Sequence, residues 1–496
     1  MVLMLRSSLL MMIVVVGVAW SVALADDVDP DVDWPQFRGY RAAGQMRSAG
    51  IPSHWDVKSG KHVVWKAKVP GLGHASPIIC GDAIYVVTAI SGAADAGLRV
   101  GLYGDIASVE DDTVHIWKLF SFCKYTGKVL WERTLHSGVP RIKRHTKATH
   151  ANATPATDGT HLVVSLGSEG LFCYDLAGNH LWKRELGLLD SGYYVVPAAQ
   201  WGFGSSPIIF QGRVILQCDV QSNSFLAAFD VRDGRELWRS PRQDVPTWST
   251  PTILEGAFRT ELLVNGYRHA GGYDPLTGRE LWRLGGGGDI PVCTPITAGD
   301  LIILSSAHGG PAPLRAIRAG AEGDITPAGP NTSSAHIAWS LPRDGIYMQT
   351  PIVYGDYLYT CKNNGVLSCY EVRSGKRLYR QRLAGGVGFT ASAVAADDKL
   401  YFTSEEGGVF VVQAGPKFVL LAENQMGEIC MTTPAITDGL FVIRTAGHLY
   451  GIGQRPLMVP RHRANLLFSR SGLKRRRMAS GKLRQLLRNL RTRLLP

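Results

Sequence analysis

Several side chains in the middle of the sequence could bind a metal ion or an anion. Imidazole groups bind transition metals well, and the candidates are His145, His150, His269 and His308. No two of them have the HxH or HExxH spacing of familiar metal-binding segments, so we predict no metal site and expect loop histidines that are solvated or hydrogen-bonded. The segment Arg144–His150 is basic and rich in histidine, which makes Arg144 and His150 a candidate anion site.

Groups for acid–base or nucleophilic catalysis do not form a motif. The carboxylates of Asp190, Asp244 and Asp289 are scattered among expected loops. These loops hold so many serines and threonines that no nucleophile–histidine–acid triad can be chosen from the sequence. We therefore predict no catalytic residues.

The eight cysteines are expected to be buried free thiols. None are adjacent, none have CxxC spacing, and most lie in apolar strand patterns such as Leu171–Tyr174. Unpaired cysteine packs as a small apolar side chain, whereas disulfides formed after export are the alternative. A CxxCH segment is absent, so nothing indicates covalently attached haem.

The N-terminus predicts export. Arg6, an apolar run over Leu9–Trp20 and the small-x-small site Ala23–Ala25 are typical of a signal peptide over residues 1–25. An uncleaved anchor is the alternative, because the apolar stretch approaches the length that spans a bilayer. We expect an exported protein of the periplasm or cell envelope.

Residues 455–496 are predicted to form a basic tail. The chain has 53 Lys and Arg against 41 Asp and Glu, and 12 of these basic residues lie in residues 456–496, which contain no acidic residue. Lys482–Leu495 has the leucine spacing of an amphipathic helix. Such a helix suits an anionic membrane surface, contacted through residues 470–496, or an acidic partner; a partly disordered solubilising tail is the alternative. Export makes a nucleic-acid partner unexpected.

A short motif recurs eight times along the body of the chain. Each copy has a small or polar residue, a proline (alanine after Ser392), an apolar pair, a tight turn and further short strands that end near an aromatic residue. The first residues of the copies are Ser76, Thr154, Ser206, Thr250, Thr294, Thr350, Ser392 and Thr433. Four short strands repeated every roughly 40–50 residues predict an all-β fold, an eight-bladed β-propeller over residues 55–454.

The two ends of the repeat region are expected to meet. Only seven fourth strands follow the eight first strands, whereas Val63–Lys66 has the pattern of a fourth strand with no blade before it. It should complete the blade that begins at Thr433, which would remove the open edges of a linear array. Residues 26–54 precede the ring as an N-terminal arm. The tryptophans that mark the fourth strands are expected to pack between blades.

Long connections indicate which face of the ring binds a ligand. The longest are Ser91–Val114, His136–Asn152, Gly187–Phe203 and Asp219–Ser224, and all belong to the face that carries the fourth-to-first connections. Rigid scaffolds carry function on such loops, so we expect the ligand at the mouth of the central channel on this face. The candidate binding residues are His74, Arg144, His150, Asn152, Trp201, Trp248, Arg268, His269 and Gln349, with Phe203, His308, Met348, Phe389 and Met431 at neighbouring positions.

The repeats resemble the pyrroloquinoline-quinone-type propeller repeat. Gly234–Trp238 and Gly278–Trp282 match its Gly-Arg-x-Leu-Trp end, while Asp33–Gly39 and Ala199–Pro207 are similar to segments of exported, planctomycete-type members. The resemblance covers residues 33–454 and implies the propeller fold. The superfamily includes quinoprotein alcohol and glucose dehydrogenases, the periplasmic barrel-assembly lipoprotein and sensor domains that bind no quinone, so fold does not decide function.

Three functional hypotheses stay open. Quinoprotein dehydrogenases of this fold place a vicinal disulfide over the quinone, a tryptophan beneath it, and Ca²⁺ on Glu, Asn and Asp beside a catalytic Asp. This sequence has no Cys-Cys pair, and Trp201 or Trp248 could be a quinone platform or blade packing. We therefore expect a non-catalytic binding or scaffold module for a protein or polymer of the envelope, with no cofactor. A separate hypothesis, by analogy only, is an accessory role in outer-membrane assembly. The alternative is an enzyme, either a hydrolase at the channel mouth or a dehydrogenase with pyrroloquinoline quinone and Ca²⁺.

Overall fold

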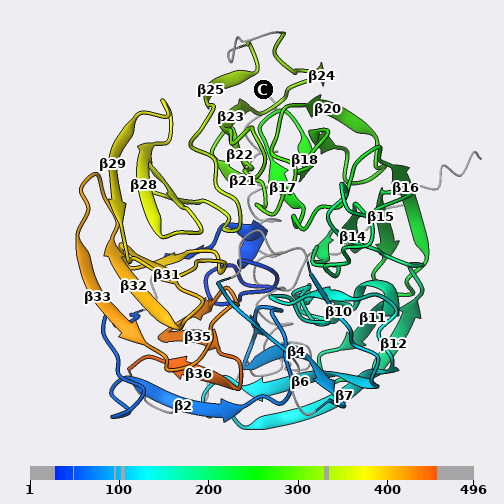
Figure 1. The fold of residues 1–496 in the computed structure, drawn as a ribbon, viewed down its shortest axis with the longest axis vertical. Coiled ribbons are helices and arrows are strands. Elements are labelled where there is room, and N and C mark those ends of the chain that lie inside the picture. The colour runs from blue at the N-terminus through cyan, green and yellow to red at the C-terminus, as the bar shows by residue number, and fades with distance from the viewer. Residues whose placement is uncertain (1–27, 48–49, 94–96, 102–106, 329–333, 455–496) are drawn as a thin grey trace, which may run out of the picture. The chain divides into compact units, whose positions relative to one another are not determined.

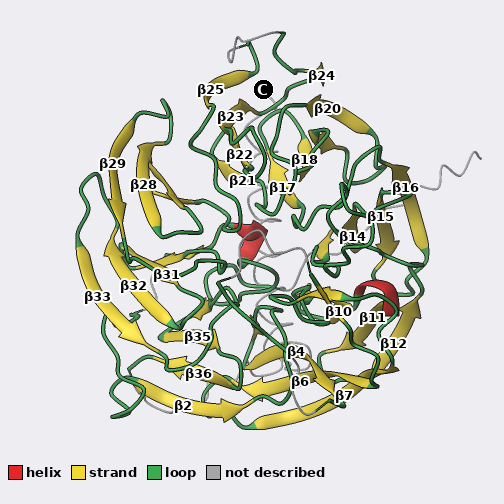
Figure 2. Ribbon diagram, in the orientation of Figure 1, coloured by secondary structure: helices red, strands yellow, loops and turns green. Residues whose placement is uncertain are grey.

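The protein is an eight-bladed β-propeller, as the repeats predicted (Figure 1). The structure, a computed structural model, describes residues 28–47, 50–93, 97–101, 107–328 and 334–454. Strands dominate, and the helices of this part are two 3-10 turns, η1 (Tyr40–Ala42) and η2 (Gly167–Glu169) (Figure 2). None of the helices described could cross a lipid bilayer. The predicted signal peptide and basic tail lie outside the described residues.

Each blade is built on four antiparallel strands, ordered from the channel outwards. Blade 1 contains β3 (Ile78–Cys80), β4 (Ala83–Ser91), β6 (His115–Cys123) and β7 (Val129–Gly138). Blade 2 contains β9 (Ala156–Thr157), β10 (His161–Ser165), β11 (Leu171–Asp175) and β12 (His180–Arg184). Blade 3 contains β13 (Ile208–Phe210), β14 (Arg213–Cys218), β15 (Phe225–Asp230) and β16 (Glu236–Pro241). Blade 4 contains β17 (Thr252–Glu255), β18 (Thr260–Val264), β19 (Ala270–Tyr273) and β20 (Glu280–Leu284).

The second half of the ring repeats this order. Blade 5 contains β21 (Ile296–Ala298), β22 (Leu301–Ser305), β23 (Leu314–Arg318) and β25 (Ile337–Leu341). Blade 6 contains β26 (Ile352–Tyr354), β27 (Tyr357–Cys361), β28 (Val366–Glu371) and β29 (Arg377–Arg382). Blade 7 contains β30 (Val394–Ala396), β31 (Lys399–Thr403), β32 (Gly408–Gln413) and β33 (Leu420–Gln425). Short extra strands are β1 (Gln45–Met46) beside β30, β24 (Gly323–Asp324) beside β20, and the pair β5 (Ser108–Val109) and β8 (Arg144–His145).

Blade 8 joins the two ends of the repeat region. Its inner strands are β34 (Ala435–Thr437), β35 (Leu440–Arg444) and β36 (His448–Ile452), and its outer strand is β2 (Val63–Lys68). Trp65 lies opposite Gly451 in the antiparallel pairing of β2 with β36. The predicted closure by an N-terminal strand is therefore confirmed. Each of the eight blades has its fourth, outer strand.

The tryptophans of the fourth strands pack between blades, as predicted. In five interfaces the indole Nε1 donates a hydrogen bond to a backbone carbonyl of the next blade: Trp65 to Lys124, Trp131 to Leu176, Trp182 to Val231, Trp238 to Pro275 and Trp339 to Val372. The glycine of the next blade's Thr-Gly-type turn lies against the indole, as Gly234 does on Trp182. A Cβ at that glycine would come within 2.6 Å of the indole ring. The tryptophan therefore requires a glycine at this position of the turn.

The repeated serine or threonine before each first strand forms a belt around the axis. Its backbone N–H donates to the side-chain oxygen of the corresponding residue in the next blade, at 2.9–3.2 Å, in seven of the eight interfaces: Ser76 to Thr154, Thr154 to Ser206, Ser206 to Thr250, Thr294 to Thr350, Thr350 to Ser392, Ser392 to Thr433 and Thr433 to Ser76. This belt is the physical reason for the recurring hydroxyl residue. It holds the inner ends of the blades at the channel.

The N-terminal arm lies on the axis of the ring, against the first strands of several blades. Its segment lies at the centre of the ring, drawn in blue in Figure 1. The carbonyl of Pro35 accepts a hydrogen bond from Thr157 of blade 2, and that of Arg41 accepts one from Thr252 of blade 4. On the other side, β1 pairs in parallel with β30 of blade 7. The arm therefore ties together blades that are far apart around the ring.

Arg38 anchors the arm without an ion pair. Its guanidinium donates to the carbonyls of Pro351, at 2.8 Å, and Ala393, at 3.3 Å, and no described carboxylate pairs with it. The side chain is fully buried, and burial lowers its pKa to about 9.

The cysteines are free thiols inside the blades. All eight are unpaired and only Cys123 is not fully buried, which confirms the sequence expectation. Burial raises the pKa of Cys293 and of Cys369 to about 12, so these thiols stay protonated at neutral pH.

Candidate functional site

A cavity of about 660 Å³ opens at the mouth of the central channel, and we call it the mouth cavity. All eight blades contribute to it through the connection that precedes the first strand. One lining residue from each blade, in chain order, is His74, Asn152, Gly204, Trp248, Ile290, Met348, Thr390 and Met431. Phe37 of the arm also lines the cavity. The next residue, Arg38, bonds the carbonyls of Pro351 and Ala393 beside the belt, so Phe37 lies at the inner end of the cavity.

One wall of the mouth cavity is aromatic. Tyr193 stacks on Trp201 with ring centroids 5.7 Å apart and an interplanar angle of 2°, and Trp248 continues the wall at 5.7 Å from Trp201. On the other side of Tyr193, His308 makes an edge contact at 5.9 Å and itself packs on Tyr347 at 5.2 Å. The Trp248 indole is oriented by a 2.8 Å hydrogen bond from Nε1 to the carbonyl of Gly202. The wall thus presents large apolar faces that are already positioned.

His308 is the most constrained member of this wall. Its backbone φ of 106° is one that L side chains rarely adopt. Its Nδ1 lies 2.6 Å from Oδ1 of Asp289, and the Tyr193 hydroxyl donates to Oδ2 of the same carboxylate at 3.3 Å. A His–Asp pair can serve as a general base, but no described hydroxyl or thiol bonds to the His308 ring. The contacts shown orient His308 within the wall rather than assemble a triad.

The opposite side of the cavity contains a buried ion pair. The Lys147 ammonium lies 2.8 Å from Oε1 of Glu405, and the Thr390 hydroxyl donates to the same oxygen at 2.6 Å. His74 Nε2 lies 2.6 Å from the carbonyl oxygen of Lys147 and donates to it. Burial lowers the pKa of His74 to about 4, so the imidazole is neutral at neutral pH. The charge of Lys147 is balanced by Glu405, and His74 adds none.

Of the candidate binding residues, the structure brings four together at the mouth cavity: His74, Asn152, Trp201 and Trp248. The neighbouring positions His308, Met348 and Met431 line it too. The five others are not among the lining residues. Gln349 is 1% exposed, Arg268 is exposed and His269 lies 3.5 Å from Glu280. Arg144 and His150 both contact Asp111. Adjacent positions of one connection can face different surroundings: Met348 lines the cavity, whereas Gln349 is buried outside its lining.

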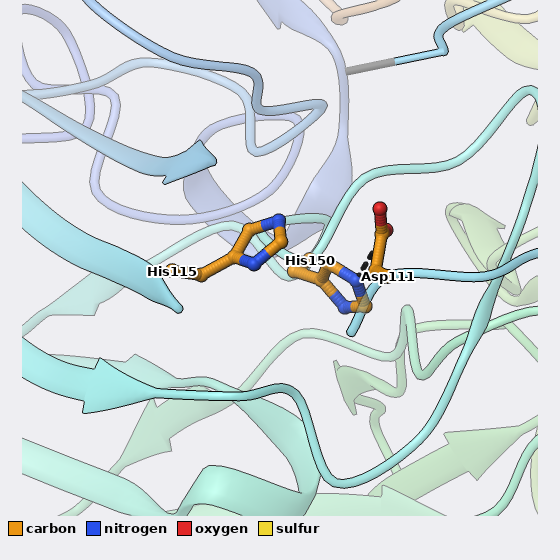
Figure 3. Close-up of side chains that lie close together, drawn as sticks. All are labelled: Asp111, His115 and His150. Carbon is orange, nitrogen blue, oxygen red and sulfur yellow. Dashed lines mark hydrogen bonds and ion pairs between the residues drawn. The ribbon is translucent and has the colours of Figure 1, made fainter. Parts of the chain in front are cut away.

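Outside the cavity lining, Asp111, His115 and His150 form a second cluster (Figure 3). Oδ2 of Asp111 lies 2.8 Å from His150 Nε2 and accepts a 2.7 Å bond from Arg144 Nε. Burial opposes ionisation of Asp111, but the hydrogen bond with His150 and the charge of Arg144 outweigh it and lower its pKa from the ordinary value. Burial also lowers the pKa of His150, against the effect of Asp111. The guanidinium proposed for an anion is therefore already bonded to a carboxylate.

Sequence reasoning missed Tyr193 and Tyr347 in the wall, and Asp111 and His115 in the second cluster. The only signal for the last two is their spacing of four residues where a long connection enters β6. This spacing matches no ligand motif. Their partner His150 is brought to them by the pairing of β5 with β8, which the sequence pattern does not show.

The fold and the mouth cavity define an eight-bladed β-propeller with a ligand-sized chamber on its axis. Residues 124–310 and 226–415 match the sequence profile described as outer membrane protein assembly factor BamB, and together the matches cover more than half of the chain. The chain therefore belongs to this family of pyrroloquinoline-quinone-type repeat propellers. No curated relative matches the sequence.

Solved structures share the fold at low sequence identity. A europium-containing methanol dehydrogenase superposes with a TM-score of 0.55 and 11% identity, over 86% of this chain and 98% of that chain. The quinohemoprotein alcohol dehydrogenase of Comamonas testosteroni has a TM-score of 0.55 and 12% identity, over 87% and 83%. BamB of Moraxella catarrhalis has a TM-score of 0.49 and 13% identity, over 74% and 100%. At identities this low, the two dehydrogenase structures show the fold alone.

The mouth cavity does not fit a quinone held by Ca²⁺. Calcium takes six to eight oxygen ligands, with carboxylates prominent among them. None of the described residues that line the cavity carries a carboxylate. The nearby Glu405 and Asp289 are bonded to Lys147 and His308. With all eight cysteines unpaired, a disulfide cover over a quinone is also missing from these residues.

Proposed function

We propose that this protein is an exported, non-catalytic β-propeller that binds a protein of the cell envelope by taking a short segment of it into the mouth cavity. The mouth cavity is the observation that carries this proposal. Its volume of about 660 Å³ lies within the range of about 300–1,000 Å³ typical of sites that enclose drug-sized ligands. A loop tip or chain terminus has this size, whereas a folded domain does not.

The lining favours a segment with a large apolar or aromatic side chain. Trp201, Tyr193 and Trp248 offer ring faces, and Met348 and Met431 add flexible side chains that adapt to irregular shapes. Hydroxyl and amide groups around the cavity, such as Asn152, can hydrogen-bond to a peptide backbone. This combination of aromatic anchors and polar surroundings is typical of protein recognition.

Two further observations support binding over catalysis. The one His–Asp pair found at the described cavity wall, His308 with Asp289, lacks a bonded nucleophile. The donor set of the cavity also does not suit the Ca²⁺ of quinoprotein dehydrogenases. The family description, which names an outer membrane assembly factor, supports an envelope protein as the partner, and the N-terminal sequence supports export. Sequencing the N-terminus of the protein recovered from the envelope fraction tests export: a start at Asp26 is expected.

Site-specific photocrosslinking tests the binding proposal. A photoreactive phenylalanine derivative replaces Tyr347 in the cavity, and in a control it replaces Phe258, which is 80% exposed in a turn of blade 4. Irradiation in intact cells is expected to join an envelope protein to the cavity position and not to the control. A cavity position that captures no protein, or the same proteins as the control, would overturn the proposal.

Affinity for the captured protein is then measured with Trp201→Ala. Loss of a buried aromatic anchor costs about 2 kcal/mol or more, so the dissociation constant should rise at least about 30-fold. Phe258→Ala, the matched aromatic deletion outside the cavity, should leave it unchanged. Quinone absorbance that the purified protein retains after incubation with quinone and Ca²⁺ and desalting would instead support a dehydrogenase.

A further inference from the structure

We propose that Asp111, His115 and His150 bind one divalent transition-metal ion of the Zn²⁺ type. One ligand atom from each side chain can be chosen so that all three lie within 4.8 Å of one another. Figure 3 shows the three side chains converging from the connection before β6, the start of β6 and the connection before β9. The site stands apart from the mouth cavity and does not depend on the proposed function.

The donor set suits such an ion. Two imidazoles and one carboxylate make up the protein ligands of many zinc sites, where a water molecule takes the fourth position. The same set suits other first-row divalent ions, whereas Ca²⁺ and Mg²⁺ prefer oxygen ligands alone. The side chains of Asp111 and His150 are only 8% and 7% exposed, and His115 is buried. A nearly closed site of this kind holds its ion with little competition from bulk water.

The surroundings orient each ligand, as they do in metal sites. His115 Nδ1 donates to the carbonyl of Thr113 at 3.0 Å, which leaves the lone pair of Nε2 for an ion. The Trp117 indole donates to the carbonyl of His150 at 2.8 Å and holds that residue's backbone. Arg144 Nε donates to Oδ2 of Asp111, and Oδ1 of the same carboxylate accepts no bond from the described residues. Oδ1 is thus the oxygen that can turn to an ion.

The positive charge of Arg144 limits the expected affinity of the site for the metal ion. A guanidinium beside the carboxylate repels a cation, so binding should be weaker than in a structural zinc finger. We expect a dissociation constant of about 1–10 μM. On binding, the ion replaces the hydrogen bond between His150 and Asp111.

An ion at this site would hold a wall of the mouth cavity. Asp111 belongs to the long connection of blade 1, and His150 belongs to the connection between blades 1 and 2. The latter also carries the cavity residues His145, Lys147 and Asn152. Only the short pairing of β5 with β8 joins the two connections as strands. The metal would add a link to this pairing and to the bond between Arg144 and Asp111.

Metal titration of the full chain, purified without a histidine tag and treated with EDTA, tests the proposal. Zn²⁺ binding by calorimetry should show one site, and Co²⁺ should give the visible absorbance bands of a four- or five-coordinate ion with histidine ligands. His115→Ala and Asp111→Asn should each weaken Zn²⁺ binding at least about 100-fold. His136→Ala is the matched control, because His136 packs on the same Trp117, at 5.2 Å, but is outside the cluster. The His136→Ala variant should bind Zn²⁺ with the affinity of the unaltered protein.

The Asp111→Asn variant distinguishes loss of a metal ligand from misfolding, because asparagine keeps the shape of aspartate and can still accept a hydrogen bond from Arg144. Its near-ultraviolet circular dichroism should match that of the unaltered protein. Absence of a stoichiometric site with a dissociation constant below about 100 μM would overturn the proposal. So would unchanged affinity in His115→Ala, or an equal loss in His136→Ala.

Discussion

Replacing Trp65 by alanine should open the ring at blade 8. Trp65 is 7% exposed in β2, the strand that the N-terminal region contributes to the last blade. Its indole packs on Gly127 of blade 1 and donates to the carbonyl of Lys124 at 2.8 Å. The substitution therefore removes a contact between blades 8 and 1 as well as a part of the core of blade 8.

The expected cost follows from these contacts. Truncating a buried tryptophan to alanine costs about 3–5 kcal/mol, and the lost hydrogen bond contributes about 1 kcal/mol to that total. Trp182→Ala is the matched control. Trp182 is also 7% exposed, donates to Val231 at 2.8 Å and packs on Gly234, but its strand β12 lies within a blade formed by one continuous stretch of chain.

Hydrogen exchange of the β2 amides, with urea denaturation, separates the two variants. Both should lower the free energy of unfolding by a similar amount. Only Trp65→Ala should let β2 detach locally, and a loss of about 3 kcal/mol corresponds to exchange of the amides of Val63–Lys68 about 100-fold faster. If β2 amides exchange equally in the two variants, or if Trp65→Ala costs less than about 1 kcal/mol, β2 does not hold the ring closed in the way described.

Two further predictions concern buried titratable side chains, His74 and Arg242. Burial lowers the pKa of His74 to about 4 from an ordinary 6.5, so the unfolded chain binds a proton between these values that the folded chain does not. This part of the stability is complete above pH 6.5 and is lost as the pH falls towards 4. His74→Gln should therefore reduce the loss between pH 7.5 and pH 4.5 by about 2–3 kcal/mol in urea denaturation; identical pH profiles would contradict this. Arg242→Met should cost about 3–5 kcal/mol, because fully buried Arg242 bonds Asp219 at 2.8 Å and Asp244 at 2.9 Å. The surface variant Arg239→Met should cost at most about 1 kcal/mol, and equal costs for the two would refute the argument.

The ring was predictable because its signals are local and repeated. The hydroxyl residue before each first strand recurs because the belt needs one oxygen per blade, as between Ser76 and Thr154. The Gly and Trp of the outer strands recur because each turn glycine, such as Gly234, must fit against an indole of the preceding blade. Even closure was visible, since the strand around Trp65 had no partner in its own neighbourhood.

For the candidate site, only the location was predictable from the sequence. The connection before the first strand reaches the channel in every blade, which is why His74, Asn152, Trp201 and Trp248 lie at the mouth cavity. The direction of each side chain was not predictable, because the long connections have no repeat and their paths depend on contacts with one another. Gln349, next to the lining residue Met348, is buried away from the cavity for this reason.

The amino-acid sequence by itself determined the number of blades, their order and the strand that joins the ends, because each blade is a local unit whose pattern repeats. Only the tertiary structure decided which side chains meet. Tyr193 stacks on Trp201, and Asp111 reaches His150, through contacts between connections that are distant in the sequence and follow no period. The position of the N-terminal arm also depends on contacts between distant segments. The hydrogen bonds of Arg38 to Pro351 and Ala393 exist only once the ring has closed around the arm.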